Sequence, residues 1–478
     1  MIRHCKTGIA RRSLTRSRGE AFPPVLRLVR EVRRRVDADT ASAMLASIEA
    51  NRLVVLCGAG LSMPSPSDVP SAKALANHVT DSYKVLTGSS DLDPHRDSLE
   101  AVADYFLQRN ELVSILIRTL VDWRPFRGHP NAAHFCLADF LGAHAVRHAT
   151  TTNFDELTEL AARQLGERDF RSALDGDQAA AGGQGHAPYL KVHGCVNRDI
   201  DHTLWCRGQL VNGEIAARLS RSATWLAGNL LQRDVVVVGF WSDWKYLIDV
   251  LQNCLNPSAP ASVTIVDPKT NAELAADAPA LWAWAHKGHF RHVQESALTF
   301  LDELRRLFSL SFLRRMMTQA APTHAAWCGH PYAGPQPDAL FAAATTADLF
   351  ALRQDAAGAP VGEMPRLKRP DAGTDMVAAM QMLLAENGAV LDGSLFVREQ
   401  KRIRIVRGGG QALSLIKASY LNEAGTPEPV DIIVAAGAED DGGAAANIVR
   451  EGAVPNVVRP GAIGRWVTFQ QARQELGV

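Results

Sequence analysis

The sequence has little that would place it in a membrane. No stretch approaches the roughly 20 consecutive apolar residues that a membrane-spanning helix needs. The chain also has no net charge, because 51 Lys and Arg are balanced by 51 Asp and Glu. A chain with this balance has no overall field that attracts nucleic acid or an anionic membrane surface. We therefore expect no membrane contact, and contact with nucleic acid only through a local basic segment or a partner.

Closely spaced cysteines are absent as well. The chain has 7 cysteines, and they are scattered along the sequence. Structural zinc sites usually contain Cys pairs about two to four residues apart, and disulfide frameworks belong to small secreted domains. Cys195 and Cys206 are the nearest neighbours, and they lie too far apart for such a pair. We expect no bound metal, no disulfide framework and a reducing, cytoplasmic location.

The composition is that of a soluble globular chain, with 46% hydrophobic and 21% charged residues. A length of 478 residues predicts two or three domains. Residues 319–340 are rich in Pro, Gly and Ala, which predicts a linker. We expect it to divide an α/β domain at residues 37–318 from a smaller domain at residues 341–478.

Residues 1–36 form a basic arm, with ten Arg and one Lys against Glu20 and Glu31. Blocks of like charge usually stay solvated, so a partly disordered tail is the first interpretation. A segment that contacts nucleic acid or an acidic partner, a transit peptide, and upstream sequence read from a wrong start codon are the alternatives.

Short apolar runs alternate with helical patterns along the first domain. A helix is expected at residues 37–50, and the buried strands are expected at 53–57, 145–151, 189–192, 235–238 and 263–266. Apolar strands that alternate with helices indicate a Rossmann-like parallel sheet with helices on both faces. Ligands bind beyond the carboxyl ends of such strands. The residues that follow the strands should therefore gather round one crevice, and they are Gly58, Asn153, His193, Gly239 and Asp267.

The turn Gly58-Ala59-Gly60-Leu61-Ser62 lies between a predicted strand and a predicted helix. Small residues there let the backbone approach a phosphate, whose charge is met by backbone N–H groups. A short glycine motif also serves ordinary tight turns, so a plain turn stays open.

Two further motifs follow later strands. In Thr151-Thr152-Asn153-Phe154-Asp155, the Asn side chain can hold a ribose hydroxyl or a water, and the Asp can accept a hydrogen bond from a carboxamide. The alternative is a helix cap. His193, at the end of a predicted strand, can act as a general base, although a single His is more often structural.

Taken together and in this order, these motifs resemble the sirtuin (Sir2) family over about residues 37–310. The family's Gly-Ala-Gly-x-Ser loop is matched by Gly58–Ser62. Its Thr-Gln-Asn-x-Asp motif is matched by Thr151–Asp155, with Thr152 in place of Gln, and its His-Gly motif by His193-Gly194. Its later Gly-x-Ser element is matched by Gly239 and, one position displaced, Ser242.

The resemblance implies an NAD⁺ site. Gly58, Ala59, Gly60 and Ser62 would surround the pyrophosphate and its riboses. Asn153 would position the nicotinamide ribose or a water, Asp155 would hold the carboxamide, and His193 would act as the base. Thr152 and Gly239 would border the nucleotide, and Ser242 and Asp267 would serve the adenosine end.

Departures from the family pattern suggest a branch of it. The two Cys-x-x-Cys pairs that support the acyl-lysine cleft of sirtuin deacylases are absent. The segment Gly128-His129-Pro130-Asn131-Ala132-Ala133-His134 resembles the Sir2-like NAD⁺ hydrolases of bacterial anti-phage defence. This implies release of nicotinamide and ADP-ribose during abortive infection. An NAD-dependent deacylase, a non-catalytic NAD or ADP-ribose sensor, and ADP-ribosyl transfer are the alternatives.

Uncontrolled NAD⁺ hydrolysis would be toxic, so we expect a switch that involves a homo-oligomer, a protein activator, or an ATPase-type or Argonaute-type partner. The region 341–478 is the candidate for this regulatory or partner-binding role. Helices near 374–386 and 412–421, strands at 402–406 and 431–435, and Gly-rich turns predict a small α/β or α+β module.

Overall fold

The computed structural model describes residues 36–182, 185–211, 213–241, 259–421, 423, 429–440 and 464–478. The expected basic arm lies outside these residues, apart from Val36. Among the described helices, none is long and apolar enough to cross a bilayer.

The first sheet has six parallel strands in the order β3-β2-β1-β4-β5-β6. In chain order they are β1 (Leu53–Cys57), β2 (His148–Thr151), β3 (Tyr189–Lys191), β4 (Asp234–Val238), β5 (Ser262–Val266) and β6 (His289–Val293). The strand order reverses between β1 and β4, as in Rossmann folds, and the carboxyl ends flanking this point are where ligands bind.

Alternate residues of the central strands enter two different cores. Val55 of β1 packs with the helices at residues 38–49 and 132–142 and with the first half of the helix at 297–328. Val54 packs with the helices at residues 213–230, 271–277 and 279–285 on the opposite face. Strands that are buried on both faces read as continuous apolar runs, and this is why the sequence showed them clearly. The prediction of a Rossmann-like parallel sheet with helices on both faces is confirmed.

The helices that accompany this sheet are α1 (Ala38–Glu49), α2 (Ala72–Thr87), α3 (Leu99–Gln108), α4 (Ala132–Gly142), α5 (Leu157–Gln164), α6 (Gly176–Ala181), α7 (Gly213–Leu230), α9 (Asn271–Asp277), α10 (Pro279–Ala285) and α11 (Ala297–Cys328). The 3-10 helices are η1 (Ala59–Leu61), η2 (Asp93–His95), η4 (Pro125–Arg127), η5 (Ile200–His202), η6 (Arg207–Val211) and η7 (Ala372–Thr374), and η3 (Leu112–Leu120) is a π-helix.

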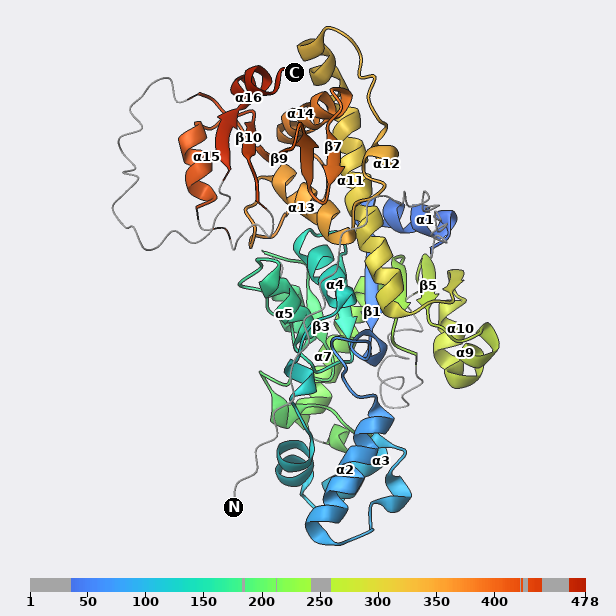
Figure 1. The fold of residues 1–478 in the computed structure, drawn as a ribbon. Coiled ribbons are helices and arrows are strands. Elements are labelled where there is room, and N and C mark those ends of the chain that lie inside the picture. The colour runs from blue at the N-terminus through green and yellow to red at the C-terminus, as the bar shows by residue number, and fades with distance from the viewer. Residues whose placement is uncertain are drawn as a thin grey trace, which may run out of the picture. The chain divides into compact units, whose positions relative to one another are not determined.

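Between β1 and β2 the chain forms a helical layer with its own hydrophobic cluster. Helices α2 and α3 lie side by side (Figure 1), and η3 completes the layer. Phe106 of α3 and Leu116 of η3 are fully buried in it. The aromatic residues Phe154 and Trp205, which follow β2 and β3, join the same cluster. This contact brings the helical layer to the carboxyl edge of the sheet.

A second, mixed sheet has the strand order β11-β10-β9-β8-β7. Its strands are β7 (Val390–Asp392), β8 (Leu395–Arg398), β9 (Lys401–Arg407), β10 (Ile432–Ala436) and β11 (Arg465–Thr468). Its helices are α12 (Pro337–Leu340), α13 (Thr346–Ala357), α14 (Asp375–Glu386), α15 (Leu413–Ser419) and α16 (Phe469–Leu476). Strand β9 is parallel to β10 and antiparallel to β8. The expected smaller module of α/β or α+β type is therefore present.

The linker expected at residues 319–340 is wrong in its first half, because α11 continues to Cys328. Pro322 lies inside this helix and removes one backbone donor. The helix continues because Phe308 is buried in the first core, while Leu313 and Ala320 are buried in the second. In Figure 1, α11 is the long yellow helix, and it contacts both α4 and α14.

Candidate functional site

A cavity of about 430 Å³ opens at the carboxyl ends of the first sheet. Seven of the predicted site residues line it: Ala59, Ser62, Thr152, Asn153, Asp155, His193 and Gly239. They follow β1, β2, β3 and β4, as parallel strand topology requires. The helical layer supplies part of the opposite wall, including Leu75 of α2 and Leu99 of α3.

The glycine loop after β1 lies directly against the loop after β4. A Cβ on Gly60 would lie 2.8 Å from the Gly239 Cα, and one on Gly58 would lie 2.9 Å from the Thr152 Oγ1. Gly239 has a φ of +61°, and its carbonyl accepts a hydrogen bond of 2.8 Å from the Gly60 N–H. The N–H of Ala59 makes no hydrogen bond within the described part of the chain. The glycines thus allow two backbones to touch, and the Ala59 N–H stays available as a donor in the cavity wall.

Ser62 is at the centre of a buried hydrogen-bond network. Its hydroxyl is 3.0 Å from the His134 Nε2 and 3.0 Å from the Asn153 Nδ2, and it donates to the Asp155 Oδ2 over 2.8 Å. The His134 Nδ1 accepts a hydrogen bond from the Asn131 backbone N–H, so its Nε2 carries the proton and donates to Ser62. The hydroxyl therefore accepts two hydrogen bonds and donates one, which saturates it.

Burial lowers the pKa of His134 to about 4, although Asp155 and Glu159 oppose this effect. The imidazole is therefore neutral at pH 7, in agreement with a single proton on Nε2. The Ser62 hydroxyl makes all three of its hydrogen bonds within the protein. It therefore has no hydrogen bond left for the pyrophosphate that the sequence led us to expect there. Its position favours a role in orienting Asn153.

The orientation of the Asn153 amide is fixed by its partners. Its Nδ2 donates to the Gly58 carbonyl over 3.1 Å and to the Ser62 hydroxyl. A carbonyl oxygen can only accept, so the atom beside Gly58 must be the nitrogen. The Asn153 Oδ1 has no hydrogen-bond partner among the residues that the structure describes. Since Asn153 lines the cavity, it can offer this acceptor to a hydroxyl or a water.

His193 lies in the wall of the cavity and is almost fully buried. Burial, followed by the positive charge of Arg218, lowers the pKa of His193 to about 3, while a hydrogen bond to the Thr152 backbone opposes the shift. Gly194 has a φ of +91°, a conformation that favours glycine after the histidine. The structure therefore places a neutral imidazole at the site.

Asp155 is held between two protein donors. Its Oδ2 accepts from Ser62 and its Oδ1 accepts from the backbone N–H of Leu157, at the start of α5. Its own carbonyl accepts from the buried Lys191, which forms a 2.7 Å ion pair with Glu159. Burial alone would lower the pKa of Lys191, but the charge of Glu159 raises it above its ordinary value. Asp155 thus combines the helix-start role, which the sequence left open, with a place in the cavity wall.

Aromatic side chains form the apolar part of the wall. Phe154 stacks on Trp205 with ring centroids 5.0 Å apart, and Phe126 lies 5.5 Å from Phe154. The three rings line the cavity. They limit the access of water to the polar groups at the sheet edge, because large rings fill space that water would otherwise occupy.

Among the described predicted residues, Gly58, Gly60 and Asp267 are not part of the cavity lining. Asp267 lies at the end of β5, where its Oδ1 accepts from the Lys269 backbone N–H and its own backbone N–H donates to Val293. It is not among the residues that line the cavity. Ser242 lies outside the described residues.

The sequence did not single out several residues that shape the site. His134 belongs to a segment noted for its resemblance to NAD⁺ hydrolases, but nothing in its pattern indicated a contact with Ser62. Lys191 and Trp205 gave no signal, because a single Lys in a strand or a single Trp in a loop has many ordinary roles.

No family model matches the chain, and no curated protein matches it. Solved structures with a similar arrangement include a mutant Sir2 homologue in complex with ADP-ribose. It is 14% identical, with 57% of this chain and 96% of that chain covered and a TM-score of 0.31.

Two others are a Sir2 homologue in complex with NAD and a Sir2 enzyme from a study of mechanism and regulation. The first is 14% identical over 55% of this chain and 91% of that chain, with a TM-score of 0.29. The second is 13% identical over 56% of this chain and 97% of that chain, with a TM-score of 0.27. Because these sequence identities and TM-scores are low, the fold assignment rests on the strand order of the chain itself.

Proposed function

We propose that the chain is an NAD⁺ hydrolase, which cleaves the N-glycosidic bond between nicotinamide and ribose. The observation that carries the proposal is the orientation of Asn153. Both N–H groups of its amide are held by Gly58 and Ser62, and its oxygen is left as an acceptor beside the cavity. An oriented acceptor of this kind suits a ribose hydroxyl or an attacking water.

The reaction needs positioning more than strong acid or base chemistry. When the bond between C1′ and the nicotinamide nitrogen breaks, its electron pair leaves with neutral nicotinamide and positive charge develops on the ribose. Water then adds at C1′ and releases one proton, giving ADP-ribose. The aromatic wall of Phe126, Phe154 and Trp205 supports this proposal, because it limits bulk water near the reacting carbon.

His193 would take part as a neutral hydrogen-bond acceptor. A pKa of about 3 makes it a weaker base than the family resemblance implies. A buried and uncharged imidazole can accept a hydrogen bond from a ribose hydroxyl. It can also receive the proton of that hydroxyl once the substrate has displaced water from the site. Asp155 would act through Ser62, since both its oxygens already accept protein hydrogen bonds.

The binding residues would be those at the two glycine loops. The Ala59 N–H offers a donor to a pyrophosphate oxygen, while Thr152 and Gly239 border the nucleotide. Gly58 and Gly60 would contribute by allowing the loops to approach each other. The adenosine end, for which Ser242 and Asp267 were expected, stays a prediction.

The experiment is to add NAD⁺ to the purified full chain and follow nicotinamide and ADP-ribose by chromatography. We expect release that falls at least 100-fold in Asn153→Ala and His193→Ala, with Gly228→Ala as control, since a Cβ at that α7 position meets no atom within 4 Å. If all four proteins release equal amounts, or none releases any under any activating condition, the proposal is wrong.

A second candidate function is an NAD or ADP-ribose sensor without turnover. The low basicity of His193 favours it, because a site without an effective base can bind a nucleotide and leave it intact. Calorimetry that shows NAD⁺ binding, without nicotinamide in the same sample, would select the sensor. An acyl-peptide assay in parallel tests the deacylase alternative, and labelled NAD⁺ that leaves label on protein would reveal ADP-ribosyl transfer.

We further propose that the activity serves anti-phage defence and that the module of residues 341–478 regulates it. The support is the resemblance of residues 128–134 to the defence NAD⁺ hydrolases, together with the role that this segment has here. Asn131 donates to the carbonyls of Leu61 and Pro64, and His134 donates to Ser62, so the segment fixes the glycine loop. Co-purification from infected and uninfected cells, followed by mass measurement, tests for an oligomer or a partner.

A further inference from the structure

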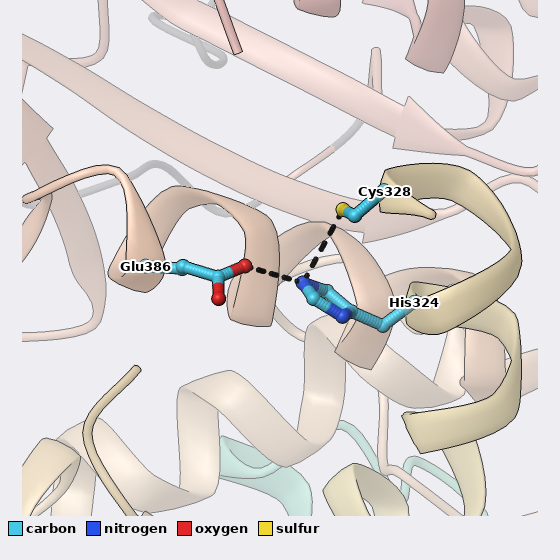
Figure 2. Close-up of side chains that lie close together, drawn as sticks. All are labelled: His324, Cys328 and Glu386. Carbon is cyan, nitrogen blue, oxygen red and sulfur yellow. Dashed lines mark hydrogen bonds and ion pairs between the residues drawn. The ribbon is translucent and has the colours of Figure 1, made fainter. Parts of the chain in front are cut away.

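Three side chains that commonly bind metals meet at the ends of two helices. Figure 2 shows His324 and Cys328 on α11 and Glu386 at the end of α14, with their functional atoms turned toward one another. The side chain of His324 is fully buried and that of Glu386 is 15% exposed. The cluster is separate from the cavity of the first sheet, because none of the three residues lines that cavity.

The distances within the cluster are close to those of a metal site. The His324 Nε2 is 3.5 Å from the Cys328 Sγ and 2.9 Å from the Glu386 Oε2, and all three ligand atoms lie within 4.8 Å of one another. Tetrahedral Zn²⁺, with bonds of about 2.0 to 2.3 Å, separates nitrogen from sulfur by roughly 3.6 Å and nitrogen from oxygen by roughly 3.4 Å. The first separation is already present, and the second needs a shift of about half an ångström. The Cys328 Sγ and the Glu386 carboxylate oxygen, which lie within 4.8 Å of each other, would take a separation of roughly 3.6 Å.

The local electrostatics favour a cation at this point. Cys328 is the last residue of α11 and Glu386 is the last residue of α14, and helix C-termini carry partial negative charge. Neither helix has a basic residue in its last turn. A carboxylate at such a position is unfavourable unless a positive charge offsets it.

The ligands are also held in place before any ion binds. His324 and Cys328 are four residues apart on one helix, so they project from the same face. The Glu386 Oε1 accepts a 2.8 Å hydrogen bond from the Ala333 backbone N–H, which directs Oε2 toward His324. Such outer contacts orient ligands in known metal sites.

We propose that His324, Cys328 and Glu386 bind one Zn²⁺ ion and leave its fourth position to water. Binding replaces the hydrogen bond between His324 and Glu386 with two bonds to the metal. The neutral imidazole of His324 then carries its single proton on Nδ1 instead of Nε2, and the thiol of Cys328 releases its proton to solvent. The ion would join the ends of α11 and α14. In the sequence analysis we expected no bound metal because the chain has no closely spaced cysteines. That criterion does not detect a site with a single cysteine whose other ligands are a histidine and a glutamate.

The test uses the full chain without a histidine tag, stripped with a chelator and then dialysed against Zn²⁺ or Co²⁺. We expect one equivalent of Zn²⁺ per chain and, with Co²⁺, the charge-transfer absorption that a thiolate ligand produces. Cys328→Ser should remove this absorption, and Glu386→Gln should weaken binding at least tenfold. The melting temperature should rise with Zn²⁺ in the wild type and not in these variants.

Two controls make the outcome specific. Cys206→Ser changes a buried cysteine elsewhere and should keep the absorption, and Glu303→Gln removes a carboxylate from α11 and should keep the affinity. The proposal is overturned if the chelated wild type takes up no metal, or if Cys328→Ser binds Co²⁺ with the wild-type spectrum. Nicotinamide release enters none of these measurements.

Discussion

The two sheets of the molecule end in similar glycine junctions but have different polar surroundings. In the first sheet, the Gly60 N–H donates to the Gly239 carbonyl over 2.8 Å. In the second, the Gly410 N–H donates to the Gly437 carbonyl over 2.8 Å, and a Cβ on Gly408 would lie 2.2 Å from the Ala438 nitrogen. Both sets of glycines let neighbouring loops touch. Glycine motifs alone therefore report a close backbone approach.

What distinguishes the first junction is one acceptor that its side chains leave without a protein partner. Ser62 accepts hydrogen bonds from the neutral His134 and from Asn153 and donates to the Asp155 carboxylate, while the Asn153 Oδ1 has no hydrogen-bond partner among the described residues. The second sheet buries a charged group, in which the Arg404 Nη2 lies 2.6 Å from the Asp355 Oδ1 and 2.7 Å from the Glu423 Oε1. The network of the first sheet leaves the Asn153 Oδ1 beside the cavity, whereas the charges of this group in the second sheet pair with one another.

The largest effect is expected from Arg404→Met. It leaves Asp355 and Glu423 buried without their cation, and breaking a buried charge pair typically costs about 3 to 5 kcal/mol of the free energy of unfolding. The exposed Arg465→Met on β11 should change it by less than about 1 kcal/mol. Urea unfolding measures both. Equal stabilities of the two variants would show that the charged group does not support the second sheet.

The next largest effect is expected on nicotinamide release, which a substitution in the first glycine junction should reduce and one in the second should not. Gly60→Ala forces a Cβ against the Gly239 backbone and should displace the loop that holds Asn153, with a loss of nicotinamide release of about 100-fold. Gly408→Ala should destabilise the second sheet by about 1 to 3 kcal/mol and leave the release per folded chain within about twofold. A large loss of release in folded Gly408→Ala would instead connect the second junction to the site.

A smaller effect is expected from pH. The pKa of His134 is lowered to about 4 and those of His148 and His193 to about 3 by burial, against a usual value of 6.5. Below pH 6.5 the unfolded chain binds protons that the folded chain does not, so the free energy of unfolding should fall by at least about 2 kcal/mol between pH 6.5 and 4. His148→Gln should reduce this slope in urea titrations. A free energy of unfolding that rises as the pH is lowered from 6.5 to 4 would contradict the conclusion that these buried histidines are neutral.

The smallest effect concerns the orientation of Asn153. Ser62→Ala removes one of the two acceptors that hold its amide, and we expect kcat for nicotinamide release to fall about tenfold with little change in KM. Ser114→Ala, on the η3 helix outside the cavity lining, is the control. An unchanged kcat in Ser62→Ala would show that the Gly58 carbonyl alone orients the amide.

The sequence was sufficient for five of the six strands of the first sheet and for the sheet edge at which the candidate site residues gather. Strands buried on both faces have strong apolar runs, so β1 was predicted at its observed bounds. Asn153 and His193 follow such strands, and parallel topology then brings them together. Strand β6 (His289–Val293) was missed because three of its five residues are His or Arg and the strand is only partly buried.

Other features depend on contacts that no local pattern encodes. His134 reaches Ser62 only because α4 packs against β2 and shares a core with β1, and Glu386 meets His324 only because α14 packs along α11. The linker was predicted to begin at residue 319 because Pro322 and the following glycines are typical of a linker, while burial in the second core keeps α11 intact to Cys328.

The most direct measurement is a crystal structure of the Asn153→Ala chain with NAD⁺. We predict the nicotinamide ribose between position 153 and His193, with the pyrophosphate beside the Ala59 N–H. Electron density for NAD⁺ at the glycine junction of the second sheet, or none at saturating NAD⁺, would contradict the account.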